Sequence, residues 1–240
     1  MSDSRLRPFR LGYLAAAAAT VYGAATGRDK VQWVAKPLLM PLLAADVLTG
    51  GVDIEPTERT VLLASLGAAT VGDILLIDPD DDGRLIAGAS AFAIMQTGYA
   101  GLWWRRGARP SKAIAAQRAA AWLGAGVLMR LRAPAVAIPL TAYGATLATA
   151  GVLVSDPELA PEAANIGGLN VPDGDPRSRL ALGSLLFILS DGLIVLRRVF
   201  ARSIRARRGT EAVILGTYAA AQFLLADPRA HARAHWHRTT

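Results

Sequence analysis

Apolar residues along this chain gather in long runs that are separated by short charged segments. A helix needs about 20 mostly apolar residues to cross the ~30 Å hydrocarbon core of a bilayer, and the runs have about that length. The pattern therefore predicts an all-α fold, a polytopic membrane bundle of about eight transmembrane helices. The expected helices cover residues 11–27, 31–48, 58–77, 85–104, 114–129, 133–154, 180–199 and 210–226.

These helices define a single transmembrane domain over residues 11–226, between an N-terminal segment of residues 1–10 and a polar tail of residues 227–240. The helix over 114–129 is weakly apolar and is expected to be the shortest or most irregular. Residues 155–179 form the longest polar stretch, which predicts a surface loop or a partly ordered lid. Eight spans place both termini on one side, which we assign to the cytoplasm of a bacterial-type cell membrane. Lys and Arg divide too evenly between the two sides for the positive-inside rule to fix that orientation.

Composition narrows the class of protein further. The 240 residues are 52% hydrophobic and carry a net charge of +7, which would also suit a nucleic-acid partner. The arginines, however, cluster at the ends of apolar runs, as in membrane proteins, so we expect a lipid bilayer and no nucleic acid. A basic start followed by an Ala-rich run also fits a signal peptide, but a first transmembrane helix is favoured. The absence of cysteine excludes disulfides and thiol catalysis.

Three apolar runs contain an acid in the same local pattern of a small residue, Asp, any residue and Leu. The acids are Asp46, Asp73 and Asp191. A carboxylate inside a membrane span is costly and by default marks a functional site. Asp46 is expected near the opposite face of the membrane and is left out of the main site. Lys36 is expected at a depth similar to that of Asp73, where it either pairs with an acid or extends its ammonium group to the interface.

Two patterns resemble metal sites but carry weak signals. The acidic turn over residues 78–83 matches the first half of a calcium loop, but Ala89 stands where that loop needs Glu. We interpret it as a solvated turn. His231 and His235 have a spacing that suits a metal, yet both are expected in an exposed tail. No metal or other cofactor is predicted.

The order of several short motifs resembles the YhhN-like integral membrane proteins, a family that includes the lysoplasmalogenases. The resemblance extends over residues 30–225. The residues on which it rests are Lys36-Pro37, Gly72-Asp73-Ile74-Leu75, Gly88, Phe92, Tyr99, Leu186-Phe187, Ser190-Asp191, Thr217-Tyr218 and Gln222. One position departs from the family pattern, because Gln96 stands where the family usually has His.

The resemblance implies an eight-helix bundle that hydrolyses the vinyl ether of a lysophospholipid, a lysoplasmalogen. The products would be a fatty aldehyde and glycerophosphoethanolamine or glycerophosphocholine. Two buried carboxyls suit this reaction, one as general acid and one as charge stabiliser, so Asp73 and Asp191 are the predicted catalytic residues. The predicted substrate-binding residues are Lys36, Gln96, Tyr99, Tyr218 and Gln222. Serine-hydrolase chemistry is not supported, since the chain lacks a G-x-S-x-G motif.

Two other functions fit the same residues. Intramembrane Asp and Lys also serve proton-coupled transport, and the similar segments around Asp73 and Asp191 resemble an internal duplication. A transporter or lipid-binding protein should then show two related halves, whereas a hydrolase should show one pocket with an apolar tunnel. The third function is that of a catalytically silent family member, which is suggested by Gln96 at the position where the family usually has His.

Overall fold

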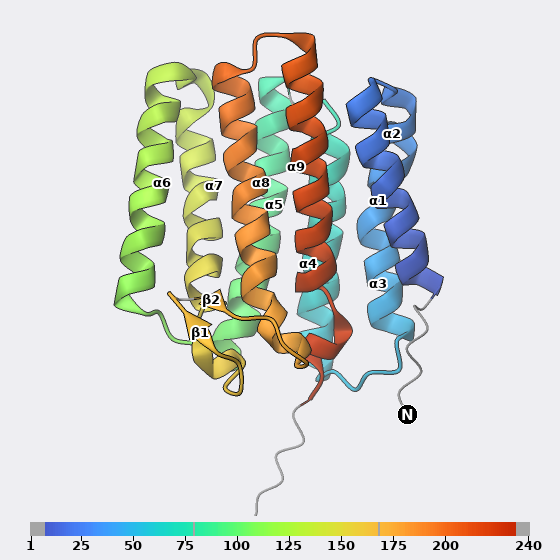
Figure 1. Ribbon diagram of the computed structural model, residues 1–240, viewed down its shortest axis with the longest axis vertical. Helices are drawn as coiled ribbons and strands as arrows, with labels where there is room; N and C mark the ends of the chain where they lie inside the picture. Colours follow the sequence, from blue (N-terminus) through green and yellow to red (C-terminus); the bar gives the residue numbers. More distant parts are fainter. Residues whose placement is uncertain (1–7, 79, 168, 234–240) are drawn as a thin grey trace, which may run out of the picture.

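Nine α-helices stand side by side in the computed structural model, which describes residues 8–78, 80–167 and 169–233 (Figure 1). They form eight columns, because α2 and α3 continue each other end to end. The α-helices are α1 (Pro8–Thr26), α2 (Asp29–Ala35), α3 (Leu39–Thr49), α4 (Pro56–Leu75), α5 (Asp82–Arg105), α6 (Lys112–Arg132), α7 (Pro134–Leu153), α8 (Leu180–Phe200) and α9 (Ile204–Leu225). The shorter elements are the 3₁₀ turns η1 (Lys36–Leu38), η2 (Pro157–Leu159), η3 (Pro176–Arg179) and η4 (Pro228–His231), with strands β1 (Asn165–Ile166) and β2 (Leu169–Asn170). The all-α prediction is confirmed.

Most helix ends lie close to their predicted positions, with two corrections. Helix α9 begins at Ile204 rather than near residue 210, because the Ser203 hydroxyl caps it by accepting the Ala206 N–H. Helix α6 is a continuous helix of 21 residues and is not the shortest, contrary to the prediction. Its many alanines favour helix even where the apolar run is weak.

The most irregular column is the one formed by α2 and α3. Its α-helix is interrupted at Lys36 by the 3₁₀ turn η1, where Pro37 lacks the backbone N–H donor. Pro41 causes no comparable break, because it lies in the first turn of α3, where a missing N–H is tolerated.

Two glycines allow α4 and α5 to approach closely. A Cβ built at Gly72 would lie 2.8 Å from the Phe92 ring, and one at Gly88 would lie 2.7 Å from Leu76. A larger residue at either position would therefore force the two helices apart. The contact fixes the last turn of α4, which carries Asp73, against the Phe92 side chain of α5.

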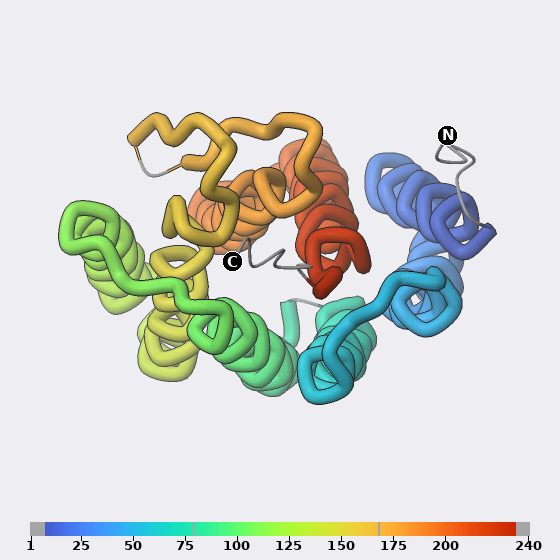
Figure 2. The backbone as a smooth tube through the Cα atoms, turned by 90° about the horizontal axis from the view of Figure 1, so that it is seen from below, coloured from blue at the N-terminus to red at the C-terminus, as the bar shows by residue number. Residues whose placement is uncertain are grey.

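The columns form a ring when the bundle is viewed along its axis (Figure 2). Neighbours around it are α1, α9, α8, α7, α5, α4 and α3, while α6 lies outside and packs on α7. Helices α7 and α8 contact each other less than most neighbours in the ring do.

Four columns are long and apolar enough to cross a membrane, judged by length and composition. They are Asp29–Thr49, Asp82–Arg105, Pro134–Leu153 and Pro176–Phe200. Each of the other four, α1, α4, α6 and α9, packs directly against one of them.

The helix α1 begins, and α9 ends, at the same end of the bundle, here called the terminal end (Figure 1). The described residues of the segment 155–179 also lie there, and they contain η2, the β1–β2 hairpin and η3. Residues 228–231 fold into η4, and His231 is 1% exposed. The expectation of an exposed tail is therefore wrong for these residues, whereas His235 lies outside the described residues.

Candidate functional site

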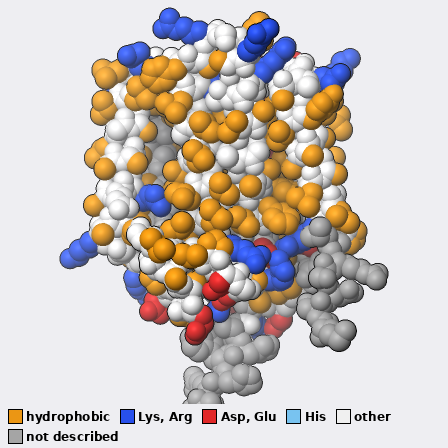
Figure 3. Space-filling view, in the orientation of Figure 1, with side chains coloured by type: hydrophobic (Ala, Val, Ile, Leu, Met, Phe, Trp, Pro, Cys, Tyr) orange, Lys and Arg blue, Asp and Glu red, His pale blue; other side chains and the backbone are white. Residues whose placement is uncertain are grey.

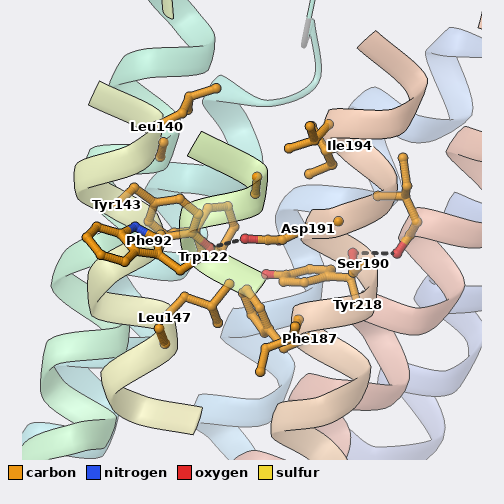
Figure 4. Close-up of a pocket in the computed structure, with 18 of the residues that line it drawn as sticks. Phe92, Trp122, Leu140, Tyr143, Leu147, Phe187, Ser190, Asp191, Ile194 and Tyr218 are labelled. Atoms are coloured by element: carbon orange, nitrogen blue, oxygen red, sulfur yellow. Dashed lines mark hydrogen bonds between the residues drawn. The ribbon is translucent and has the colours of Figure 1, made fainter. Parts of the chain in front are cut away.

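A cavity of about 280 Å³ lies between the helices α4 to α9, and most of its lining is apolar. The close-up shows aromatic and aliphatic side chains around a small group of oxygens (Figure 4). Both predicted catalytic acids, Asp73 and Asp191, line this one cavity, together with Lys36 and Tyr218. The structure thus brings together four of the seven predicted site residues, from the four separate elements η1, α4, α8 and α9.

Asp73 is held in the last turn of α4 and is 1% exposed. The hydroxyl of Tyr218, on α9, donates a hydrogen bond of 2.8 Å to its Oδ2. Tyr218 is held in turn by the rings of Phe92 and Phe187, which each meet it edge to face at centroid distances of 5.7 and 5.6 Å. These three rings form one wall of the cavity and fix the direction of the phenol.

Asp191 lies near the middle of α8 and receives the equivalent contact from another helix. The hydroxyl of Tyr143, on α7, donates a hydrogen bond to its Oδ2 (Figure 4). The neighbouring residue Ser190 donates instead to the backbone carbonyl of Ile214 on α9, at 3.0 Å. Each acid in the cavity is therefore bound by a tyrosine rather than by an arginine.

Two cations also line the cavity. The Lys36 Nζ donates to the backbone carbonyl of Leu76 at 2.9 Å. Among the described residues Lys36 forms no ion pair with Asp73, so the predicted pairing is replaced by a bond to the end of the same helix. The second cation, Arg118 on α6, has a buried Nε without a hydrogen-bond partner in the described part of the chain.

Three predicted binding residues lie outside the cavity lining. Tyr99 donates to Gln222 Oε1 at 3.0 Å, and the Gln222 amide contacts Met95 Sδ at 3.0 Å. Gln96 is 2% exposed and its Nε2 has no partner among the described residues. We expected Tyr99 and Gln222 to share a pocket with the acids. They are instead buried in the core nearer the terminal end, because Gln222 lies one helical turn beyond Tyr218.

The third acid of the repeated pattern belongs to a different site. Asp46 lies near the terminal end, where Arg10 Nε donates to its Oδ2 at 2.7 Å. The Arg10 Nη2 also reaches Asp227 at 2.6 Å, and Arg229 pairs with Asp227 at 2.7 Å. Burial raises the pKa of Asp227, but the hydrogen bonds from Arg229 and the charge of Arg10 hold it below its usual range.

His231, the last residue of η4, also lies at the terminal end. Its Nδ1 lies 3.2 Å from Arg106, which itself pairs with Glu58 at 2.7 Å. Burial, aided by the Arg106 charge, lowers the pKa of His231 to about 3. The imidazole is therefore neutral at physiological pH and serves as an internal contact of the protein.

The acidic turn between α4 and α5 is tied to the basic segment between α8 and α9, at the end opposite the terminal end. Asp80 pairs with Arg197 at 3.0 Å and with Arg207 at 2.8 Å, and Asp82 pairs with Arg198. Burial raises the pKa of Asp80, but the arginines outweigh this and lower it overall. Within the described residues no three potential ligands gather as a metal site would require. These acids are engaged with arginines rather than simply solvated.

Sequence reasoning missed two residues that contribute to the cavity. Tyr143 was not predicted as a site residue, because a single tyrosine in an apolar run gives no indication of its partner. Arg118 had a stronger signal, since it is a lone charge within a weakly apolar helix and such charges usually face a cavity or the interior.

Comparison with family models gives one match, to the YhhN family, over residues 31–228. Comparisons with curated proteins and with solved structures find no match. The matched range contains both cavity acids, their two tyrosines and both cavity cations. The chain therefore belongs to the YhhN family.

Proposed function

We propose that this protein is a membrane-embedded lysoplasmalogenase-like hydrolase that cleaves the vinyl ether of lysoplasmalogens. The observation that carries the proposal is the presence of two tyrosine-bound carboxyls in one mainly apolar cavity. Family membership is compatible with this activity. A vinyl ether has no carbonyl group for a nucleophile to attack. Its hydrolysis therefore depends on delivery of a proton and on stabilisation of the positive charge that forms, and carboxyl groups provide both.

In the proposed mechanism Asp191 is the general acid, because no cation among the described residues pairs with its carboxyl, whereas Lys36 binds the end of the helix that carries Asp73. Its proton adds to the β-carbon of the vinyl ether and leaves an oxocarbenium ion. Asp73, in the same cavity as Lys36, is ionised and stabilises that positive charge. Water adds to the cation, and the hemiacetal collapses to a fatty aldehyde and a glycerophospho alcohol. Tyr143 and Tyr218 orient the two carboxyls throughout.

The proposed location is a bacterial-type cell membrane, with all eight columns crossing it. The four less apolar columns have the same height as the four candidate spans and pack beside them (Figure 1). They also expose large apolar side chains, among them Leu14 on α1, Val71 on α4 and Val127 on α6. Such side chains suit contact with lipid. The space-filling view shows the same mainly apolar belt, with Lys and Arg gathered at both ends of it (Figure 3).

Aldehyde release by the purified protein tests the function directly. The substrates are lysolipids that share a chain and headgroup but carry a vinyl ether, an alkyl ether or an ester bond. We expect aldehyde from the vinyl ether alone. Release of fatty acid from the ester at an equal rate would contradict an acid-catalysed vinyl ether mechanism. Tight binding of all three lipids without turnover would instead favour the binding or transport class.

A further inference from the structure

Arg118 has no role in the proposed chemistry, although its side chain lines the same cavity. Its Nε is buried and has no hydrogen-bond partner among the described residues. A guanidinium is always charged, and in the apolar interior of a membrane protein it needs an anion close by. Since the described protein supplies no acid to it, the partner it fits is an anionic part of a ligand.

The position of Arg118 relative to the acids can be read from two helices. A Cβ built at Gly151 of α7 would lie 3.7 Å from the Arg118 Nε, 3.5 Å from the Ser184 Oγ and 3.0 Å from the Ile188 Cδ1 of α8. The Arg118 Nε is therefore level with the turn of α8 that contains Ser184 and Ile188, which precedes Asp191. Three to seven residues of helix rise about 5 to 10 Å. Arg118 thus lies about 5 to 10 Å from Asp191 along the bundle axis, toward the terminal end.

The cavity continues beyond the acids in the opposite direction. Leu140 and Ile194 lie above the Tyr143–Asp191 pair in the close-up, whereas Leu147 and Phe187 lie below it (Figure 4). Apolar side chains therefore line the cavity on both sides of this pair, while the cation lies only on the side of the terminal end. A lysophospholipid has matching groups, with a phosphate at one end, a glycerol carrying the cleavable bond, and a hydrocarbon chain that can extend past the acids to Leu140 and Ile194.

We propose that Arg118 binds the phosphodiester of the lysolipid and so selects phosphate-bearing substrates over uncharged alkenylglycerols. The inference rests on the proposed function for the identity of the substrate. Guanidinium groups bind phosphate through two parallel hydrogen bonds, which sets both position and specificity. With the phosphate on Arg118, the glycerol unit places the sn-1 vinyl ether beside Asp73 and Asp191.

Binding measured without turnover tests the site independently of catalysis. The ligands are an uncleavable 1-alkyl-glycerophosphocholine and the matched 1-alkylglycerol, titrated into the protein in detergent. Arg118→Gln should weaken binding of the phosphate-bearing ligand about 10- to 100-fold and leave the uncharged one unchanged, because a hydrogen bond to a charged group is lost. Arg118→Lys should be intermediate. Arg130→Gln, which alters an exposed arginine on the same helix, should bind both ligands as the wild type does.

Three results would overturn the assignment. An equal loss for both ligands would show a structural role for Arg118, and no loss for either would show that its charge faces lipid. Displacement of the alkyl lipid by inorganic phosphate alone would identify a site for a free anion. If wild-type protein binds the phosphate-bearing lipid through Arg118 but releases no aldehyde from its vinyl ether analogue, the proposed hydrolase fails while the binding site stands.

Discussion

Asp46 and Asp191 stand in the same local sequence pattern within apolar helices, yet their surroundings differ completely. Asp46 is held by Arg10 at 2.7 Å and belongs to a cluster of buried charges at the terminal end. Asp191 is held by the phenol of Tyr143 inside a cavity, and Asp73 is held likewise by Tyr218. The difference separates an acid that joins elements from two acids that remain available to a ligand.

The partner of each acid decides which of these roles it can have. An arginine cancels the charge of a carboxylate and fixes it as an anion, which stabilises contacts between α1, α3 and η4 but removes the proton that catalysis needs. A tyrosine hydroxyl orients a carboxyl and leaves it able to hold or release a proton. In the cavity the motif therefore supplies a carboxyl that can take part in catalysis, whereas at the terminal end it supplies a structural contact.

The largest expected effect comes from changing the two cavity acids to Asn. Asp73→Asn and Asp191→Asn should each fold and insert but lose about 10²- to 10⁴-fold in turnover, because an amide cannot deliver a proton or carry the stabilising charge. The double variant should be little worse than either single variant, since the two groups act as a unit. Aldehyde release and folded fraction, measured on the same samples, provide the check.

Asp46→Asn is the matched control for that series. It should lower stability while the protein that remains folded keeps its specific activity, because Asp46 lies outside the cavity lining. Full specific activity in folded Asp73→Asn or Asp191→Asn would remove the distinction between the two regions and the proposed mechanism with it.

Disruption of the terminal end should have the next largest effect, this time on stability. Arg10→Gln leaves Asp46 and Asp227 without their shared cation, and removal of one partner from a buried ion pair costs about 3–5 kcal/mol. Arg105→Gln is the control, since Arg105 meets Glu55 only at 3.8 Å on the surface, where a pair contributes about 0–1 kcal/mol. Denaturation in mild detergent compares them. Equal stabilities would show that the cluster adds nothing.

The sequence predicted helices and membrane character well because both depend on local patterns of apolar residues. It also selected Asp73, Asp191, Lys36 and Tyr218, whose unusual polarity within apolar runs is visible without a structure. It could not supply Tyr143 as the partner of Asp191, since that contact depends on how α7 approaches α8. For the same reason it grouped Tyr99 with the acids, although one further helical turn removes its partner Gln222 from the cavity lining.

A smaller effect is expected where the cavity depends on close helix packing. Gly72→Ala places a methyl 2.8 Å from the Phe92 ring, and such overpacking costs about 1–3 kcal/mol. Because Phe92 also supports Tyr218, specific activity should fall along with stability. Gly67→Ala on the same helix meets no atom within 4 Å and should be neutral or slightly stabilising. A Gly72→Ala variant with unchanged stability and activity would show that Phe92 adapts freely and that the cavity wall is not fixed by this contact.

The smallest effect concerns pH and the terminal end alone. His231 is neutral in the folded protein, where its pKa is about 3, whereas its ordinary pKa is 6.5. Below pH 6.5 the unfolded chain therefore binds a proton that the folded protein does not, so this residue makes stability fall as pH falls. The slope approaches about 1.4 kcal/mol per pH unit and continues until the pH nears the folded pKa. The nearby acid Asp227 begins to lose stabilising charge only below its ordinary pKa of 3.8, which lies outside that window. Free energies of unfolding at pH 7, 6 and 5, compared between wild type and His231→Gln, isolate the contribution. The variant should show the shallower pH dependence even if its absolute stability is lower, because glutamine does not titrate. Identical slopes in the two proteins would mean that His231 remains accessible to protons in the folded state, and that the terminal end is less tightly closed than its burial implies.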